Sequence, residues 1–102
     1  MCEEQRKKLH QILQQLGQAQ SEVCDAYETT RMSDAKWEVS RLRKDLEEDQ
    51  SIDPSIKSQL MPYFEAAWSA IIGSESTHRR AANSAAKLHE ADCCIKEILS
   101  RL

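Results

Sequence analysis

The strongest helix-break signal in this chain lies at its midpoint, in residues 47–57, which read EEDQSIDPSIK. Asp53 is a favourable N-cap residue, and Pro54 follows at the first helical position, where its missing N–H costs nothing. Two halves of similar length flank this signal. We therefore predict one domain, residues 1–102, built as an antiparallel helical hairpin. Its first arm is expected at about residues 3–48, its turn at about 49–53 and its second arm at about 54–101.

The composition favours helix throughout the rest of the chain. Only 2 glycines and 2 prolines punctuate 102 residues, and aromatic residues make up 5%. The abundant residue types, among them Ala, Gln, Glu, Lys and Leu, lose little rotamer freedom in a helix. Hydrophobic residues amount to 40% of the chain, which is enough to fold but only around a thin core. The expected fold class is all-α.

The stretch around Gly73, residues 68–84, has two interpretations. Residues spaced seven apart keep one helical phase through it: Leu60, Ala67, Ser74, Ala81, Leu88, Ile95 and Leu102. A loop of arbitrary length would let that register slip, so we favour a continuous helix that is weakened or bent at Gly73. The alternative is a true break, with Ser74 or Ser76 capping a new helix.

The first half follows two registers. One contains Leu9, Leu13, Leu16, Val23, Tyr27 and Trp37, and the other contains Met32, Ala35, Val39, Leu42 and Leu46. If the turn is centred near residue 52, residue i faces about residue 103 − i, and Thr30 lies opposite Gly73. We therefore predict a coiled-coil-like hairpin of two long helices with a weak polar waist near Thr30 and Gly73. The alternative is that the chain breaks there into a three- or four-helix bundle.

The apolar side chains form a face broader than one partner helix covers. A second stripe beside the main seam contains Met61, Trp68, Ile72, Ala82, Ala86 and Cys93. Such a face needs further helical neighbours, so we expect self-association or binding to another protein's helix. The expected partner-binding residues are Trp37, Phe64, Trp68, Ile72, Leu88, Ile95 and Leu99. The aromatic members have a second interpretation as the packed end of the chain's own core, with Trp37 as the exception because it fits only one register.

We expect no metal site and no cofactor, and three residues are the candidates if a metal binds: His10, His89 and Cys93. His89 and Cys93 are four apart and share a helix face, and the facing relation brings His10 to the same level. No paired ligand motif accompanies them. Ordinary half-exposed thiols are the simpler interpretation of the 4 cysteines. A small metal- or thiol-responsive sensor is the alternative function.

Other functional classes find less support in the sequence. It contains no Gly-rich phosphate loop, nucleophile elbow or HExxH motif, so we expect no enzyme. The net charge is −3, and acids interleave with the basic pairs, which makes nucleic-acid binding a weaker alternative. No apolar run approaches the ~18 residues that cross a bilayer, and the N-terminus does not resemble a secretory signal. We therefore expect a cytoplasmic, intracellular protein with no membrane partner, leaving signal-independent export open.

The leading prediction is a non-enzymatic protein–protein interaction module. Such a protein acts as an adaptor, an assembly subunit or a chaperone-like helical protein. Its mechanism is burial of the broad apolar face against partner helices, where a few large side chains supply most of the binding energy.

Overall fold

The computed structural model describes residues 2–24 and 29–102 of the chain, and these residues form four helices with no strand among them. The helices are α1 (Cys2–Cys24), α2 (Thr29–Glu48), α3 (Pro54–Ile71) and α4 (Thr77–Arg101). The expected all-α class is therefore confirmed.

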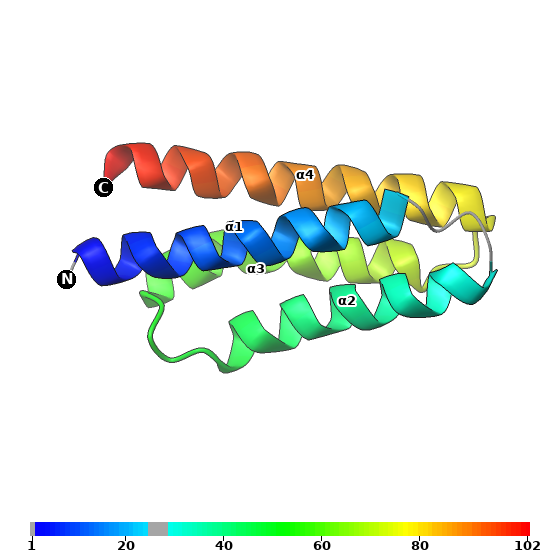
Figure 1. Cartoon of the computed structure of the whole chain (residues 1–102), viewed down its shortest axis with the longest axis horizontal. Helices are drawn as coiled ribbons and strands as arrows, with labels where there is room; N and C mark the ends of the chain where they lie inside the picture. Colours follow the sequence, from blue (N-terminus) through cyan, green and yellow to red (C-terminus); the bar gives the residue numbers. More distant parts are fainter. Residues whose placement is uncertain (1, 25–28) are drawn as a thin grey trace.

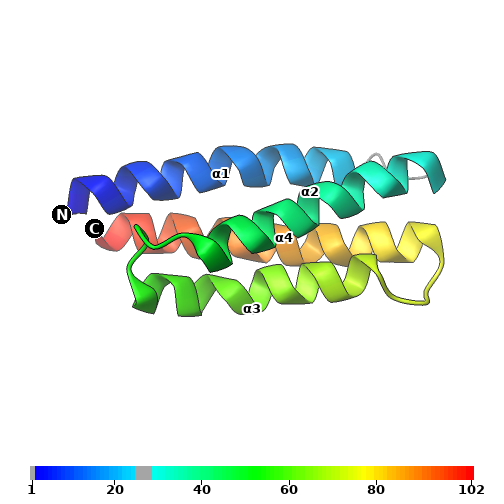
Figure 2. The same cartoon turned by 90° about the horizontal axis from the view of Figure 1, so that it is seen from below.

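The four helices lie side by side, and each runs antiparallel to its neighbour in the sequence (Figures 1 and 2). Helix α4 packs against α1 and α3, and α2 packs against the same two helices, so α1 and α3 lie on one diagonal. The molecule measures 43 × 22 × 17 Å. A helical arm of about 46 residues would be about 70 Å long. The chain therefore does not form the hairpin of two long helices that the sequence favoured.

The second arm is not continuous at Gly73, which corrects the preferred interpretation of this stretch. Helix α3 ends at Ile71, and the N–H of Gly73 donates to Ala70 O at 3.3 Å in a tight last turn. Ser76 then caps α4 by accepting a hydrogen bond from Arg79 N at 3.3 Å. Arg80 Nε donates to the carbonyl of Ile71 at 2.8 Å. That helix-end carbonyl thus obtains a side-chain partner in place of the missing next turn.

The first arm is likewise two helices. The second sequence register is the buried side of α2, whereas the first register is divided, with Leu9, Leu16 and Val23 buried in α1 and Trp37 exposed on α2. The buried residues of α1 and α2 are Leu9, Ile12, Leu16, Ala19 and Val23, followed by Met32, Ala35, Val39, Leu42 and Leu46. The connection at residues 25–28 and the side chain of Thr30 lie outside the described part of the chain. At Gly73, the predicted polar waist is therefore a turn between α3 and α4.

The break at the chain midpoint agrees with its sequence signal. Helix α2 ends at Glu48 and α3 begins at Pro54. Asp53 is the N-cap residue, and its Oδ1 accepts a hydrogen bond from Ser55 N at 2.9 Å. Pro54 occupies the first turn, where no backbone donor is needed.

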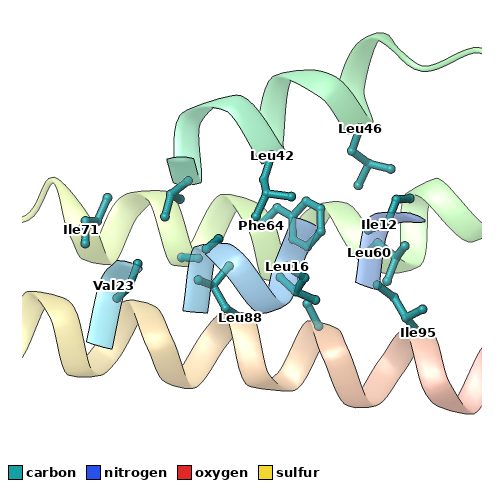
Figure 3. Close-up of a cluster of buried hydrophobic side chains, with 14 of the residues drawn as sticks. Ile12, Leu16, Val23, Leu42, Leu46, Leu60, Phe64, Ile71, Leu88 and Ile95 are labelled. Carbon is teal, nitrogen blue, oxygen red and sulfur yellow. The ribbon is translucent and has the colours of Figure 1, made fainter. Parts of the chain in front are cut away.

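Apolar side chains from all four helices meet in one core (Figure 3). Phe64 is the largest of the fully buried side chains. Figure 3 shows it beside Leu42 of α2 and Leu16 of α1. Ser84 is the one buried polar side chain among the described residues, and its hydroxyl donates to Ala67 O at 2.9 Å. This hydrogen bond offsets the cost of burying the hydroxyl.

Side-chain hydrogen bonds tie the α2–α3 connection to the start of α1. Lys8 Nζ lies 3.0 Å from Asp49 Oδ2, and Asp49 Oδ1 accepts from Ser51 N at 2.8 Å and from Ser51 Oγ at 2.6 Å. Gln5 donates from Nε2 to Ser51 O at 2.6 Å and accepts at Oε1 from Asp53 N at 2.9 Å. The Asp49 side chain is only 15% exposed, so its ion pair with Lys8 is partly shielded from solvent.

Asp49→Asn is expected to lower the free energy of unfolding by about 1–2 kcal/mol near neutral pH, because it removes a charge-assisted acceptor. Burial by itself raises the pKa of Asp49, but the hydrogen bonds from Ser51 and Lys8 outweigh burial and hold the pKa below its usual 3.8. A depressed folded-state pKa stabilises the fold above the unfolded-state pKa, and this stabilisation is lost as pH falls through the folded-state value.

Urea unfolding at a series of pH values measures this effect. The gap between wild type and Asp49→Asn should be complete above the ordinary pKa of 3.8 and should close below it. Asp45→Asn removes an exposed carboxylate from α2, one turn before Asp49, and serves as the matched control. A gap of the same size at every pH would contradict the assignment to the Asp49 charge.

Candidate functional site

Three of the seven predicted partner-binding residues are enclosed by the chain itself. Phe64 is 1% exposed, and Leu88 and Ile95 are 0% exposed. They offer no surface to a partner while this fold persists, so their assignment is corrected. The physical reason is that each helix packs against two others of the same chain. This packing buries a wider apolar face on each helix than contact with one helix would.

Two further predicted residues, Trp68 and Leu99, are half-buried and pack against the core. The guanidinium carbon of Arg43 lies 5.2 Å from the centroid of the Trp68 ring. Arg43 Nη1 also lies 3.2 Å from Glu65 Oε2, which joins α2 to α3. Trp68 thus has neighbours within its own chain and is a weaker anchor for a partner than a freely exposed ring.

Trp37 and Ile72 are exposed, as their assignment to a partner surface requires. Trp37 is 62% exposed and Ile72 is 48% exposed. On α2, at about 100° per residue, Trp37 points away from the buried side that carries Ala35 and Val39. Leu102, at 37%, is the other exposed large hydrophobic residue in the described part of the chain, and it had not been assigned to this surface.

The side chain of Trp37 is held in place by its own helix. The guanidinium of Arg41, one turn further along α2, lies over the ring with its carbon 5.1 Å from the ring centroid. Arg41 Nη2 lies 2.9 Å from Glu38 Oε2. A cation over an indole face and a carboxylate beside that cation restrict the rotamers of both side chains. An exposed tryptophan with a preferred orientation is therefore displayed on α2.

The second apolar stripe of the sequence is not a continuous surface. Ala82, Ala86 and Cys93 are exposed, but they are small and lie on the outer side of α4. The buried side of this helix carries Ala81, Ser84, Leu88, Ala91, Ile95 and Ile98. His78 is exposed and Asp92 is half-buried, so neither side chain belongs to the core.

Asp92 joins α4 to α1 by polar contacts at the edge of the core. Its Oδ2 accepts a hydrogen bond from Gln20 Nε2 at 3.3 Å, and its Oδ1 lies 3.0 Å from Lys96 Nζ. The hydrogen bond and the charge of Asp92 raise the pKa of Lys96. These contacts indicate a structural role for Asp92 at the boundary between the two helices.

The metal candidates line two different surface hollows. Cys93 Sγ and His89 Nε2 lie 3.7 Å apart on the exposed side of α4. His10 lines a different surface hollow, with Glu3, Glu4, Arg6 and Lys7 of α1. Within residues 2–24 and 29–102, no three His, Cys, Asp or Glu side chains are grouped in a way that would hold a metal ion. The structure therefore does not group His10 with His89 and Cys93.

The His89–Cys93 pair borders a surface hollow of about 300 Å³ between α3 and α4. Its other lining residues are Tyr63, Glu90, Cys94 and Glu97. Burial raises the pKa of the Cys94 thiol, and the nearby charge of Glu97 raises it further. Cys94 also packs against the core. The two adjacent cysteines therefore differ: Cys93 faces solvent, and Cys94 behaves as a small apolar side chain.

A cleft of about 290 Å³ between α1 and α2 was not anticipated from the sequence. Apolar atoms of Ile12, Leu42, Leu46 and Phe64 contribute to it, and the remaining lining residues are Lys8, Gln11, Gln15, Asp45, Glu48 and Asp49. Its existence depends on the spacing between α1 and α2, for which the residue pattern of either helix gives no signal.

Comparisons with known proteins do not add an identity to this geometry. The chain matches no protein-family model, and no curated protein or solved structure is significantly similar to it. None of the described helices is both long and apolar enough to cross a membrane.

Proposed function

We propose that this protein is a non-enzymatic protein–protein interaction module, an adaptor, assembly subunit or chaperone-like protein, built on a bundle of two antiparallel helical hairpins. The observation that carries the proposal is the 62% exposure of Trp37 on the outer side of α2. Tryptophan is highly buried on average, and exposing its large apolar ring to water is unfavourable. A partner that covers this ring gains that free energy.

The local structure of α2 supports a role for Trp37 as an anchor. Tryptophan and arginine are both enriched among the residues that dominate interface energies. The contact between Arg41 and the Trp37 ring orders both side chains before binding, which reduces the conformational entropy lost on association. A complementary partner therefore presents an apolar pocket for the indole ring, with a carboxylate or another acceptor at its rim for Arg41.

The pairing of basic residues favours this proposal over nucleic-acid binding. Arg41, Arg43 and Arg79 lie 2.9 Å, 3.2 Å and 3.5 Å from the carboxylates of Glu38, Glu65 and Glu75 respectively. Carboxylates beside these guanidinium groups oppose the approach of phosphates. A salt-dependent retardation assay with single- and double-stranded nucleic acid tests this alternative.

Trp37→Ala is expected to weaken association by about 2 kcal/mol or more, a change of roughly 30-fold in Kd, whether the partner is a second copy or another protein. The monomer itself should keep its stability to within about 0.5 kcal/mol, because the ring is exposed. Lys44→Ala, an exposed change on the same helix, is the matched control. Light scattering over a range of protein concentrations measures self-association, and affinity capture by the full chain measures binding of other proteins.

Tryptophan fluorescence adds a direct readout of the proposed surface. In a Trp68→Phe background, Trp37 supplies the only indole emission, since the chain has 2 tryptophans. A shift to shorter wavelength on association indicates that the Trp37 ring leaves water. The proposal fails if wild type and Trp37→Ala show the same oligomeric state and capture the same proteins with equal affinity.

A further inference from the structure

His89 and Cys93 lie one turn apart on the solvent side of α4, and their ligand atoms face each other. Cys93 Sγ and His89 Nε2 are 3.7 Å apart, and both residues are exposed. Residues four apart lie above one another on a helix, so the backbone holds their relative position. Thiolate sulfur and imidazole nitrogen are both preferred ligands of zinc and of related thiophilic cations.

The separation of the two atoms agrees with ligation of a single ion. Zinc bonds of about 2.3 Å to sulfur and about 2.0 Å to nitrogen, at a tetrahedral angle, place the two ligand atoms about 3.6 Å apart. The distance of 3.7 Å between Cys93 Sγ and His89 Nε2 matches this value without movement of the helix. We propose that His89 and Cys93 form a two-ligand binding site for a zinc-class divalent cation.

Binding at this site exchanges a proton for the ion. In the absence of metal, the Sγ–Nε2 contact fits a weak hydrogen bond between the thiol and the imidazole. On binding, the thiol proton passes to solvent, the thiolate bonds to the cation through Sγ, and the imidazole donates its Nε2 lone pair. No oxidant or reductant takes part, and the other coordination positions stay open to water or to an external ligand.

The surroundings favour Cys93 over Cys94 as the sulfur ligand. Cys94 is half-buried and packs against the core, whereas Cys93 is exposed. Glu90 and Glu97 also line the hollow beside the pair, so a cation that enters it meets carboxylates there. Glu90 forms an ion pair with Lys87, and Glu97 forms one with Arg101. The assignment is therefore specific to one of two adjacent thiols, which makes it sharply testable.

The test is a titration of the full chain, kept reduced with a phosphine, with cadmium as the spectroscopic substitute for zinc. Cadmium–thiolate bonds give an ultraviolet charge-transfer band, and zinc should displace it. We expect the band in wild type and in the matched controls Cys24→Ser and Cys94→Ser. It should be lost in Cys93→Ser. In His89→Gln, cadmium binding should weaken by more than about tenfold, since loss of even an outer-shell partner has an effect of that order.

The side chains of Cys24, His89 and Cys93 are exposed and that of Cys94 is half-buried, and serine is close to cysteine in size, so the variants should retain the helical circular dichroism of wild type. The proposal is overturned if wild type gives no band, if the band persists in Cys93→Ser, or if His89→Gln binds cadmium as tightly as wild type. A band that depends on Cys94 in place of Cys93 also overturns it. None of these results bears on Trp37, so the site and the proposed interaction surface stand or fall separately.

Discussion

Phe64→Ala is expected to lower the free energy of unfolding by about 3–5 kcal/mol, the range measured for large aromatic side chains removed from protein cores. Phe64 is 1% exposed and belongs to α3, and apolar side chains of other helices surround its ring (Figure 3). A domain of this length has a total stability of roughly 5–15 kcal/mol, so this single change removes a large part of it. The variant should be partly unfolded under mild heating.

The cleft between α1 and α2 places the expected loss near the lower end of that range. Phe64 lines this cleft together with Leu42 and Leu46, so the gap left by alanine opens onto an existing space that water reaches. A cavity that fills or collapses costs less than a sealed one. Urea unfolding followed by circular dichroism gives the difference, with Phe64→Leu, which keeps most of the apolar volume, as the control at less than about 1.5 kcal/mol. A loss below that of the leucine variant would show that the ring is not enclosed as described.

Sequence signals were sufficient to predict the features that depend only on neighbouring residues along the chain. The start of α3 followed from Asp53 and Pro54, because an Asx side chain and a missing N–H both satisfy the unpaired donors of a first turn. The exposure of Trp37 agrees with its failure to fit the register of Met32, Ala35 and Val39, which is the buried register of α2. Both inferences use only neighbours within about two turns of helix, where sequence spacing and spatial position agree.

The sequence favoured a continuous helix at Gly73 because a seven-residue spacing can be kept across a turn as well as along a helix. Ala81, Leu88 and Ile95 are buried, as the spacing required, but Ser74 in the same series is exposed in the turn. A five-residue turn happens to restore the phase of the next helix. The Ser76 cap is a local signal that the sequence also offers, whereas the contact of Arg80 with Ile71 depends on the chain having already reversed. Tertiary packing of α4 against α3 therefore decided between two interpretations that local pattern left nearly balanced.

The candidate sites were predictable only in part, for the same reason. The sequence indicates an apolar face broader than one seam, but it does not state whether a second chain or the same chain covers it. Phe64, Leu88 and Ile95 are covered from within, and Trp37 is not. The His89–Cys93 pair follows from a spacing of four on one helix, whereas the position of His10 required the arrangement of separate helices. Contacts within a helix were thus more predictable than contacts between helices.

The buried hydrogen bond between Ser84 and Ala67 identifies a position where side-chain size is restricted. Ser84 of α4 is 0% exposed, and its hydroxyl donates to the carbonyl of Ala67 on α3, also 0% exposed, at 2.9 Å. A hydroxyl reaches a backbone carbonyl of a neighbouring helix only where two helices approach closely, and small residues permit that approach. Serine at this position therefore satisfies two requirements, small volume and a hydrogen-bond partner.

Ser84→Leu is expected to lower the free energy of unfolding by about 2–4 kcal/mol, because overpacking costs about 1–3 kcal/mol and the lost hydrogen bond about 1 kcal/mol more. Ser84→Ala separates the two effects: it removes the hydroxyl but adds no volume, so its loss should stay near 1 kcal/mol. Urea unfolding at neutral pH measures both variants. If the leucine variant were as stable as the alanine variant, α3 and α4 would have to lie further apart at this level than the Ser84–Ala67 hydrogen bond allows. Close packing at Ser84 would then not be what holds α3 against α4.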